Sequence, residues 1–409
     1  MSSSGSTRRL ALLFAFSSAA LAAAQPVSAQ TPPPEEDRPP IQIGPVGLRP
    51  TLAFRNIGMD NNVFNEHEKP KKDFTFSFVP TLEATVQPGR LLVSVTSLNE
   101  YVYYRKYTSE RSSNNGFSAR ADVDLTMLRP FVTYSSTHTS ERPSTEIDLR
   151  ARRSVLTYSA GTSLRLGEIT SVRFSARNVS QTFREGQAFR GQDLATELNS
   201  ETRAYETALM FALTPLTSVG VNVSKERDRF ERSGLRDSDT LRVTPTVVFS
   251  PLGVMRGTAS VGYRRFTSRD PQVEDFTGLV AAGTVGTSIG ERVRIDTTFA
   301  RDVRYSYETR TPTYVLNSGR ATVTTQLFGG LDVRVTGGRD AMSYRPLAGE
   351  EDPGDDVYHS YGGGIAYRFP NNMQVGVDAE FFERASGLAA DRQYTNNRIV
   401  GTLTWGARR

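Results

Sequence analysis

The stretch FTFSFVPTLEATVQ at residues 74–87 decides the fold class of this chain of 409 residues. Within it, apolar residues from Phe74 to Phe78 and from Leu82 to Val86 alternate with polar ones. Successive side chains of a β-strand point to opposite faces, so this alternation predicts a strand with one apolar and one polar face. Similar stretches recur to the end of the chain, and no long helical pattern follows the N-terminal leader. The sequence therefore predicts one closed, all-β sheet.

Strand length indicates a membrane protein. Many of the alternating stretches extend over about 10 to 14 residues, close to the roughly 9 to 11 that a tilted strand needs to cross a bilayer. Strands of soluble proteins usually contain about 5 or 6 residues. No segment after the leader holds the roughly 18 consecutive apolar residues of a spanning helix. The pattern favours a transmembrane barrel over a secreted β-sandwich array or β-helix, which the composition alone would permit.

The N-terminal part of the chain predicts export. Residues 1–29 place Arg8 and Arg9 before a small apolar run and end on small residues, which is the pattern of a cleaved signal peptide. Residues 30–47 begin with a Pro-rich, charged segment and are expected to form an extended periplasmic tail. Residues 48–409 are predicted to form the barrel. The chain contains no cysteine, which excludes a disulfide framework and a thiolate metal site.

The connections between the alternating stretches fall into two classes. Eight are short turns with turn-forming residues, and nine are longer polar loops. The long loops lie near residues 59–72, 108–116, 139–151, 185–200, 231–238, 267–275, 307–313, 345–356 and 385–393. Eight plus nine connections predict an antiparallel up-and-down barrel of about eighteen strands. Outer-membrane barrels have short periplasmic turns and longer extracellular loops, so both termini are expected in the periplasm of a Gram-negative-type bacterium.

With the apolar face outward, the polar face would line a lumen with mixed charge and a cationic surplus. The predicted lumen-lining residues are Arg173, Arg177, Arg256, Arg264, Arg294, Arg320, Arg334, Arg368, Asp296 and Asp332. Guanidinium groups can bind carboxylates or phosphates in bidentate fashion, so these residues favour a hydrophilic, anionic cargo. The alternative interpretation is that the arginines pair with acids on neighbouring strands and stabilise the wall.

Tyrosines near the predicted outer loops also favour a membrane wall. Those that cluster close to two of the long loops are Tyr101, Tyr103, Tyr104, Tyr107, Tyr305, Tyr307 and Tyr314. Amphipathic rings prefer the headgroup interface, so we expect these side chains to face lipid headgroups. The alternative is the ordinary preference of tyrosine for strands.

No pattern in the chain predicts catalysis or cofactor binding. The sequence GTSIG at residues 286–290 matches a nucleophile elbow, but no helix follows it. The three histidines map to the opposite ends of the predicted hairpins, about a membrane thickness away from Ser288. Metal-binding and phosphate-binding motifs are also missing from the sequence. We therefore expect no catalytic residue, no metal and no cofactor, and the chain has no basic patch that would predict a nucleic-acid partner.

The first predicted hairpin carries a family resemblance. LRPTL at residues 48–52 is followed by GMDNNVF at residues 58–64, whose motif residues are Asp60, Asn61, Asn62, Val63 and Phe64. This opening resembles that of the putative β-barrel porin type 2 family, although Met59 stands where an aromatic residue is usual. The resemblance implies an outer-membrane barrel of the kind often associated with exopolysaccharide or capsule loci. It implies an exit channel for a secreted polysaccharide that works with a periplasmic export partner.

Three functions are compatible with this pattern: a polysaccharide exit channel, a general or substrate-specific diffusion porin for small hydrophilic solutes, and a structural or adhesive barrel. A diffusion porin should have an inward constriction loop, commonly the third. The third long loop, residues 139–151, is short for that role, which favours a large or loop-gated pore, although residues 185–200 could fold inward instead. The other expected partners are outer-membrane lipid, lipopolysaccharide and the barrel assembly machinery.

Overall fold

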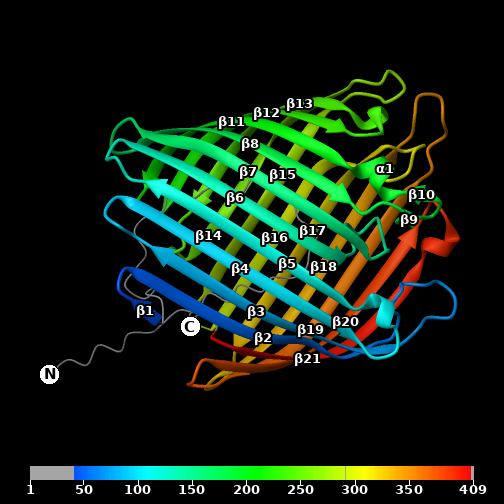
Figure 1. The fold of residues 1–409 in the computed structure, drawn as a ribbon, viewed down its shortest axis with the longest axis horizontal. Helices are drawn as coiled ribbons and strands as arrows, with labels where there is room; N and C mark the ends of the chain where they lie inside the picture. Colours follow the sequence, from blue (N-terminus) through cyan, green and yellow to red (C-terminus); the bar gives the residue numbers. More distant parts are fainter. Residues whose placement is uncertain (1–40, 291, 407–409) are drawn as a thin grey trace.

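The computed structural model describes residues 41–290 and 292–406, so the predicted signal peptide and the first part of the predicted tail lie outside the described residues. Nineteen strands pair in one sheet, and all except the short β1 form a closed barrel of eighteen strands (Figure 1). Sheet closure comes from β2, which pairs antiparallel with both β3 and the last strand, β21. The predicted eighteen-stranded antiparallel barrel is confirmed.

The barrel strands are 12 to 15 residues long, as a tilted membrane-crossing strand requires. They are β2 (Val46–Asp60), β3 (Asp73–Val86), β4 (Leu91–Tyr104), β5 (Ser112–Val123), β6 (Leu128–Glu141), β7 (Ala151–Arg165), β8 (Thr170–Phe183), β11 (Ser200–Thr214), β12 (Thr217–Phe230), β13 (Ser238–Phe249), β14 (Met255–Ser268), β15 (Phe276–Ile289), β16 (Val293–Tyr305), β17 (Thr313–Gln326), β18 (Leu331–Arg345), β19 (Asp355–Arg368), β20 (Met373–Ser386) and β21 (Tyr394–Trp405). Each strand pairs with its neighbour in the chain, which is the up-and-down order.

Three short strands, one short helix and three 3-10 turns lie at the two ends of the barrel. At one end, β1 (Ile41–Ile43) pairs with the start of β2, so regular structure begins within the stretch expected as a tail. At the other end lie β9 (Ala188–Phe189), β10 (Gln192–Asp193) and α1 (Leu194–Leu198), all in the long loop between β8 and β11 (Figure 1). Three 3-10 turns lie in other long loops, at Thr108–Glu110, Gly234–Arg236 and Ala390–Arg392. Within the described part of the chain, no helix is long and apolar enough to cross a membrane.

The two faces of the wall differ in chemistry, as the alternation requires. On β3, the half-buried Phe74 and Phe76 alternate with the buried polar residues Asp73, Thr75 and Ser77. The outward face carries exposed apolar side chains around the whole barrel, among them Phe54, Leu82, Phe174, Val243, Val261, Val335 and Ile365. A soluble protein would bury such a surface, so the outward face is suited to lipid.

The prediction that all the loop-proximal tyrosines face headgroups is wrong. Tyr101 does lie on the outward face and is 50% exposed. By contrast, Tyr104, Tyr307 and Tyr314 are buried, and the hydroxyl of Tyr305 donates to Asp228 at 2.6 Å. Tyr104 lies three positions after the outward Tyr101 on β4, so alternation places it on the inner face. For Tyr305 and Tyr314, β16 pairs with β15 only as far as Arg301 but stays paired with β17 to its end, so the tip of this hairpin is not part of the continuous wall.

Candidate functional site

The arginines of the polar face lie beside acids of neighbouring strands. Asp296 on β16 accepts from two of them, Arg256 Nη2 at 3.1 Å and Arg294 Nε at 2.6 Å. Arg334 of β18 pairs with Asp378 of β20, two strands away, and Arg368 of β19 pairs with Asp332 of the adjacent β18. This geometry is that of the alternative interpretation, in which charge pairs stabilise the wall. The side chains of Arg256 and Arg294 nevertheless remain 23% and 25% exposed, so they can still contact a solute.

The remaining predicted arginines differ in how enclosed they are. Arg264 is buried; its guanidinium donates to Asp302 at 2.6 Å and to the Val303 carbonyl at 3.0 Å. Arg173 donates to Ser163 Oγ at 3.1 Å, and Arg177 lies 3.9 Å from Glu226. Arg320 lies opposite Gly338 in the register of β17 and β18. The structure therefore distributes these residues around the wall and does not gather them into one binding site.

The motif that carries the family resemblance lies at the seam where the first and last strands meet. Asp60 is buried and forms an ion pair with Arg398 of β21, with 3.1 Å between Oδ2 and Nε. The buried Asn62 amide donates to the carbonyls of Glu66 and Thr395, both at 2.9 Å, and its oxygen accepts from the Glu66 amide. These contacts join the first long loop to the last strand, so these two residues reinforce the seam that the pairing of β2 with β21 closes.

The remaining motif residues connect the seam to the interior. Asn61 accepts from the Asn397 amide at 2.7 Å. Val63 is buried against Val102 and Tyr104, and the Phe64 ring packs edge-to-face on Tyr107 with centroids 5.0 Å apart. The Val63 carbonyl accepts from Arg142 of the third long loop at 2.8 Å. The motif thus also anchors the third loop.

Five long loops pack together at the end of the barrel that carries α1, and we call this assembly the loop cap. Its members are residues 142–150, 184–199, 231–237, 306–312 and 387–393. An apolar cluster joins three of these loops, since Ile147, Leu194, Leu198 and Tyr307 are all buried against one another. Side chains from loops far apart in the sequence thus share one small core, which fully exposed loops would not form.

A buried arginine fastens one side of the loop cap. Arg236 Nε donates to the Ser306 carbonyl at 2.7 Å, and its Nη2 donates to the Glu308 carbonyl at 3.1 Å. The same guanidinium pairs with Glu197 in α1. One side chain therefore connects the loops that follow β8, β12 and β16.

Two further buried arginines fasten the third loop to the far wall. Arg384 of β20 donates to the Thr145 carbonyl at 3.0 Å and to Asp148 at 2.7 Å. Arg392 of the last long loop donates to the Glu146 carbonyl at 3.4 Å and to the Tyr307 hydroxyl at 3.0 Å, and it forms a 2.8 Å ion pair with Asp356 of β19. Because a buried, charge-assisted hydrogen bond is stronger than an exposed one, these contacts hold the loop in place.

The third loop therefore crosses the mouth of the barrel. It leaves the wall at β6 and returns at β7, yet it contacts β20, β21 and the loop after β16. Counted the shorter way around the eighteen-stranded barrel, β20 is six strands from β6 and seven from β7. Counted the other way, it is twelve strands from β6 and eleven from β7. The expectation that this loop is too short for a constriction is wrong. The loop spans the mouth because the buried Arg384 and Arg392, from the opposite side of the barrel, donate hydrogen bonds to it. The loop of residues 184–199 also folds inward, as the alternative proposed.

Glu146, at the centre of the third loop, is a buried acid. Its carboxylate accepts from Ser306 Oγ at 2.6 Å. Burial raises its pKa to about 7, although the hydrogen bond from Ser306 and the charges of Arg392 and Arg384 oppose this effect. The loop cap therefore holds a group that titrates near neutral pH, a feature that the sequence pattern did not reveal.

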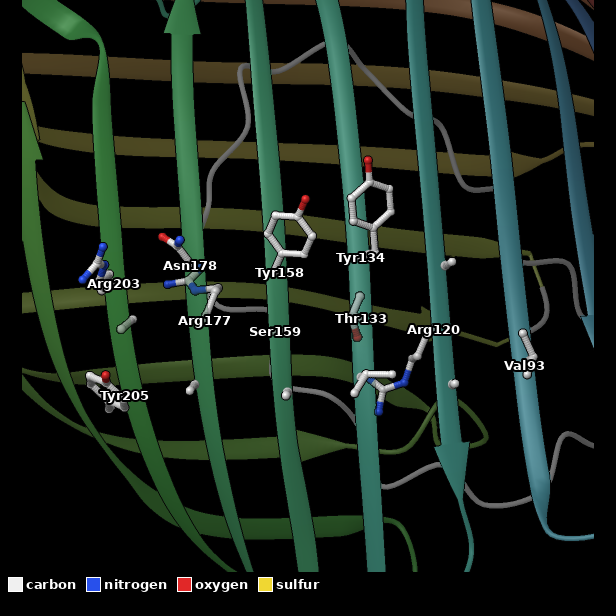
Figure 2. Close-up of a pocket in the computed structure, with 16 residues that line it drawn as sticks. Val93, Arg120, Thr133, Tyr134, Tyr158, Ser159, Arg177, Asn178, Arg203 and Tyr205 are labelled. Atoms are coloured by element: carbon white, nitrogen blue, oxygen red, sulfur yellow. The ribbon is translucent and has the colours of Figure 1, made fainter. Parts of the chain in front are cut away.

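A separate hollow of about 630 Å³ lies in the wall across β5, β6, β7, β8 and β11 (Figure 2). Tyr134 and Tyr158 come from adjacent strands and their ring centroids are 5.3 Å apart. Alanines line much of the remaining surface, and Tyr158 and Tyr205 are exposed. Arg120, Arg177 and Arg203 also line it, so the hollow combines small and aromatic side chains with guanidinium groups that belong to charged pairs (Figure 2).

One family model and several solved structures match this chain. The family model described as Putative beta-barrel porin 2 matches residues 41–405. Among solved structures, Pseudomonas aeruginosa OpdK with vanillate is 9% identical with a TM-score of 0.48, covering 87% of this chain and 98% of that one. P. aeruginosa OccK2 (OpdF) with glucuronate is 11% identical with a TM-score of 0.49, covering 88% and 98%. A BenF-like porin from Pseudomonas fluorescens Pf-5 is 12% identical with a TM-score of 0.48 and the same coverage. No curated protein matches the sequence.

Proposed function

Because the chain belongs to the Putative beta-barrel porin 2 family, we propose that it is a diffusion porin for small hydrophilic solutes, with a preference for anions. Family membership and the barrel fold support an outer-membrane porin and favour a channel over an enzyme. The observation that carries the finer proposal is the third loop, which crosses the mouth and is fastened to the far wall by Arg384. A constriction of this kind sets an upper limit on solute size.

Polysaccharide export, the function that the resemblance implied, has weaker support. A hydrated polymer needs a continuous wide passage, whereas the loop cap narrows the outer mouth with buried apolar and ionic contacts. Those contacts join several loops, so a polymer could pass only if the whole assembly moved. A small solute requires much less rearrangement.

The preference for anions rests on partly exposed arginines of the polar face. Arg256 and Arg294 lie beside one acid, Asp296, and their side chains remain 23% and 25% exposed. Arg242 pairs with Asp302 and lies 3.7 Å from Glu226, and 23% of its side chain is also exposed. Exposed guanidinium groups attract anions more than cations of equal size, and salt weakens the effect.

The proposal can be tested in liposomes that contain the purified protein. We expect small anions to enter faster than cations of matched size, by a factor of about 3 to 10 at low salt. Replacing residues 143–149 by a short Gly-Ser linker should raise the flux of larger solutes about tenfold or more. Removing the exposed residues 350–352 of another loop is the matched control and should leave flux unchanged.

Two outcomes would contradict the proposal. In the first, the wild-type protein excludes all small solutes but passes acidic oligosaccharide chains once the third loop is removed. In the second, a deletion strain loses a surface polysaccharide while its uptake of small solutes stays normal. Either result would favour the export channel.

A further inference from the structure

The outward face of the barrel has basic residues at only one end over strands β11 to β18. The exposed outward residues near the long loops are Arg203, Lys225, Arg227, Arg265, Arg301 and Arg339. They share their strand faces with exposed apolar residues, as Arg265 does with Val261 and Arg339 with Val335. Near the short turns, the outward positions of the same strands are apolar, for example Leu213, Met255 and Ile289. The basic residues therefore lie where the outer headgroup region meets the wall.

These basic residues differ in their partners. Arg203 pairs with Glu201 at 3.0 Å, and Arg227 lies 3.9 Å from Asp239. Neither Arg301 nor Arg339 has a carboxylate within 4.0 Å among residues 41–290 and 292–406. Arg301 is instead oriented by the Leu279 carbonyl, at 3.2 Å from its Nε, and by Asn317. Their positive charges are therefore open to an external anion.

A hollow of about 360 Å³ lies between these two arginines. Phe299, Asn317 and Gly319 contribute to its lining. In the sheet register Arg301 lies opposite Asn317 and Arg339 lies opposite Gly319, so the arginines flank β17 from its two sides. Two strand spacings and an offset of two residues along β17 separate their backbones by about 12 Å, which two extended arginine side chains can bridge. Gly319 leaves the floor open, because a Cβ at this position would meet no atom within 4 Å.

We propose that this hollow binds the phosphorylated headgroup of an outer-leaflet glycolipid. The phosphate lies over Gly319 between Arg301 and Arg339, and an acyl chain follows Phe299 and the apolar wall below it. Guanidinium groups bind phosphate in bidentate fashion, and the lipid-facing location excludes most soluble anions from the same contacts. The site rests on the outer-membrane location of the porin and does not depend on which solute the channel carries.

Binding of purified lipid A that carries two phosphates tests the site in detergent or nanodiscs. We expect the wild-type protein to bind it at least tenfold more tightly than dephosphorylated lipid A. Two variants, Arg301→Gln with Arg339→Gln and separately Gly319→Leu, should each lose about tenfold in affinity. The matched control is Arg203→Gln, an outward arginine with an acid partner, which should change affinity less than twofold.

Folding and channel function are checked in parallel. Each variant should keep the heat-modifiable gel mobility of a folded barrel and the wild-type solute flux, because the altered residues face away from the lumen. Equal binding of dephosphorylated lipid A would overturn the proposal. An equal loss of affinity in Arg203→Gln would also overturn it, as would displacement of the lipid by inorganic phosphate at the same concentration. None of these results would bear on solute diffusion, so the two proposals can fail separately.

Discussion

We predict that the buried acid Glu146 in the loop cap makes channel opening depend on pH. Glu146 is fully enclosed between Ser306, Arg384, Arg392 and Asp356, and burial raises its pKa to about 7 from an ordinary value near 4.5. The closed cap therefore binds a proton more tightly than an open cap in which Glu146 meets water. This tighter proton binding stabilises the closed cap fully below pH 4.5, where Glu146 is protonated in both forms. The stabilisation is lost as the pH rises through about 7.

The size of the effect follows from the pKa difference. Each pKa unit corresponds to about 1.4 kcal/mol, so a difference of about 2.5 units weakens the closed cap by roughly 3 kcal/mol between pH 4.5 and pH 8. This free energy corresponds to about a hundredfold change in the ratio of open to closed forms. A cap that is mostly closed at pH 5 should therefore be open much more often at pH 8.

Conductance across planar bilayers between pH 5 and pH 8.5 measures this change. The wild-type open probability should rise with pH and level off above about pH 7. Glu146→Gln cannot ionise, so it should remove the pH response and keep the channel mostly closed at pH 8. Glu350→Gln, at an exposed acid of another loop, should keep the wild-type response. A wild-type conductance that falls with rising pH, or a full response in Glu146→Gln, would refute the reasoning.

Two further changes test the wall and its closure. Val243→Arg places a charge on the exposed apolar face and should cost about 2 to 4 kcal/mol in urea refolding with lipid vesicles, whereas Thr246→Arg on the opposite face should cost much less. Equal costs would mean that the two faces are assigned incorrectly. Asn62→Ala removes hydrogen bonds between the first loop and β21 and should cost about 2 to 4 kcal/mol in the same assay. A loss below about 0.5 kcal/mol would show that the seam does not depend on this side chain.

The barrel itself could be predicted because its determinants are local. A strand with one face in lipid and one in water must alternate, and each connection lies next to the strands that it joins. For this reason the strand number and most loop boundaries follow from pairs such as Phe74 and Thr75, repeated along the chain. No long-range information was needed beyond closure of the sheet.

The loop cap depends on residues distant in the sequence, which is why it escaped prediction. Arg384 meets Asp148 across 236 positions, and Arg392 reaches the Glu146 carbonyl across 246. Nothing in the alternation of β20 distinguishes Arg384 from an arginine that lines the wall. One local signal did exist: Leu194 and Leu198 are four residues apart behind Asp193, whose side chain caps α1 by accepting from the Thr196 amide. An apolar helical pair in a polar loop indicates that the loop is packed against something.

The seam and the loop cap are mechanically connected, which explains why the motif at residues 60–64 combines polar and apolar residues. Asp60 and Asn62 bind the last strand and the first loop, while the Val63 carbonyl accepts from Arg142 at the base of the third loop. Arg142 also donates to the Asp148 carbonyl, so one guanidinium braces both ends of that loop. The residues that close the sheet therefore also set the position of the loop that crosses its mouth. A substitution in this motif would alter the constriction even where the barrel still closes.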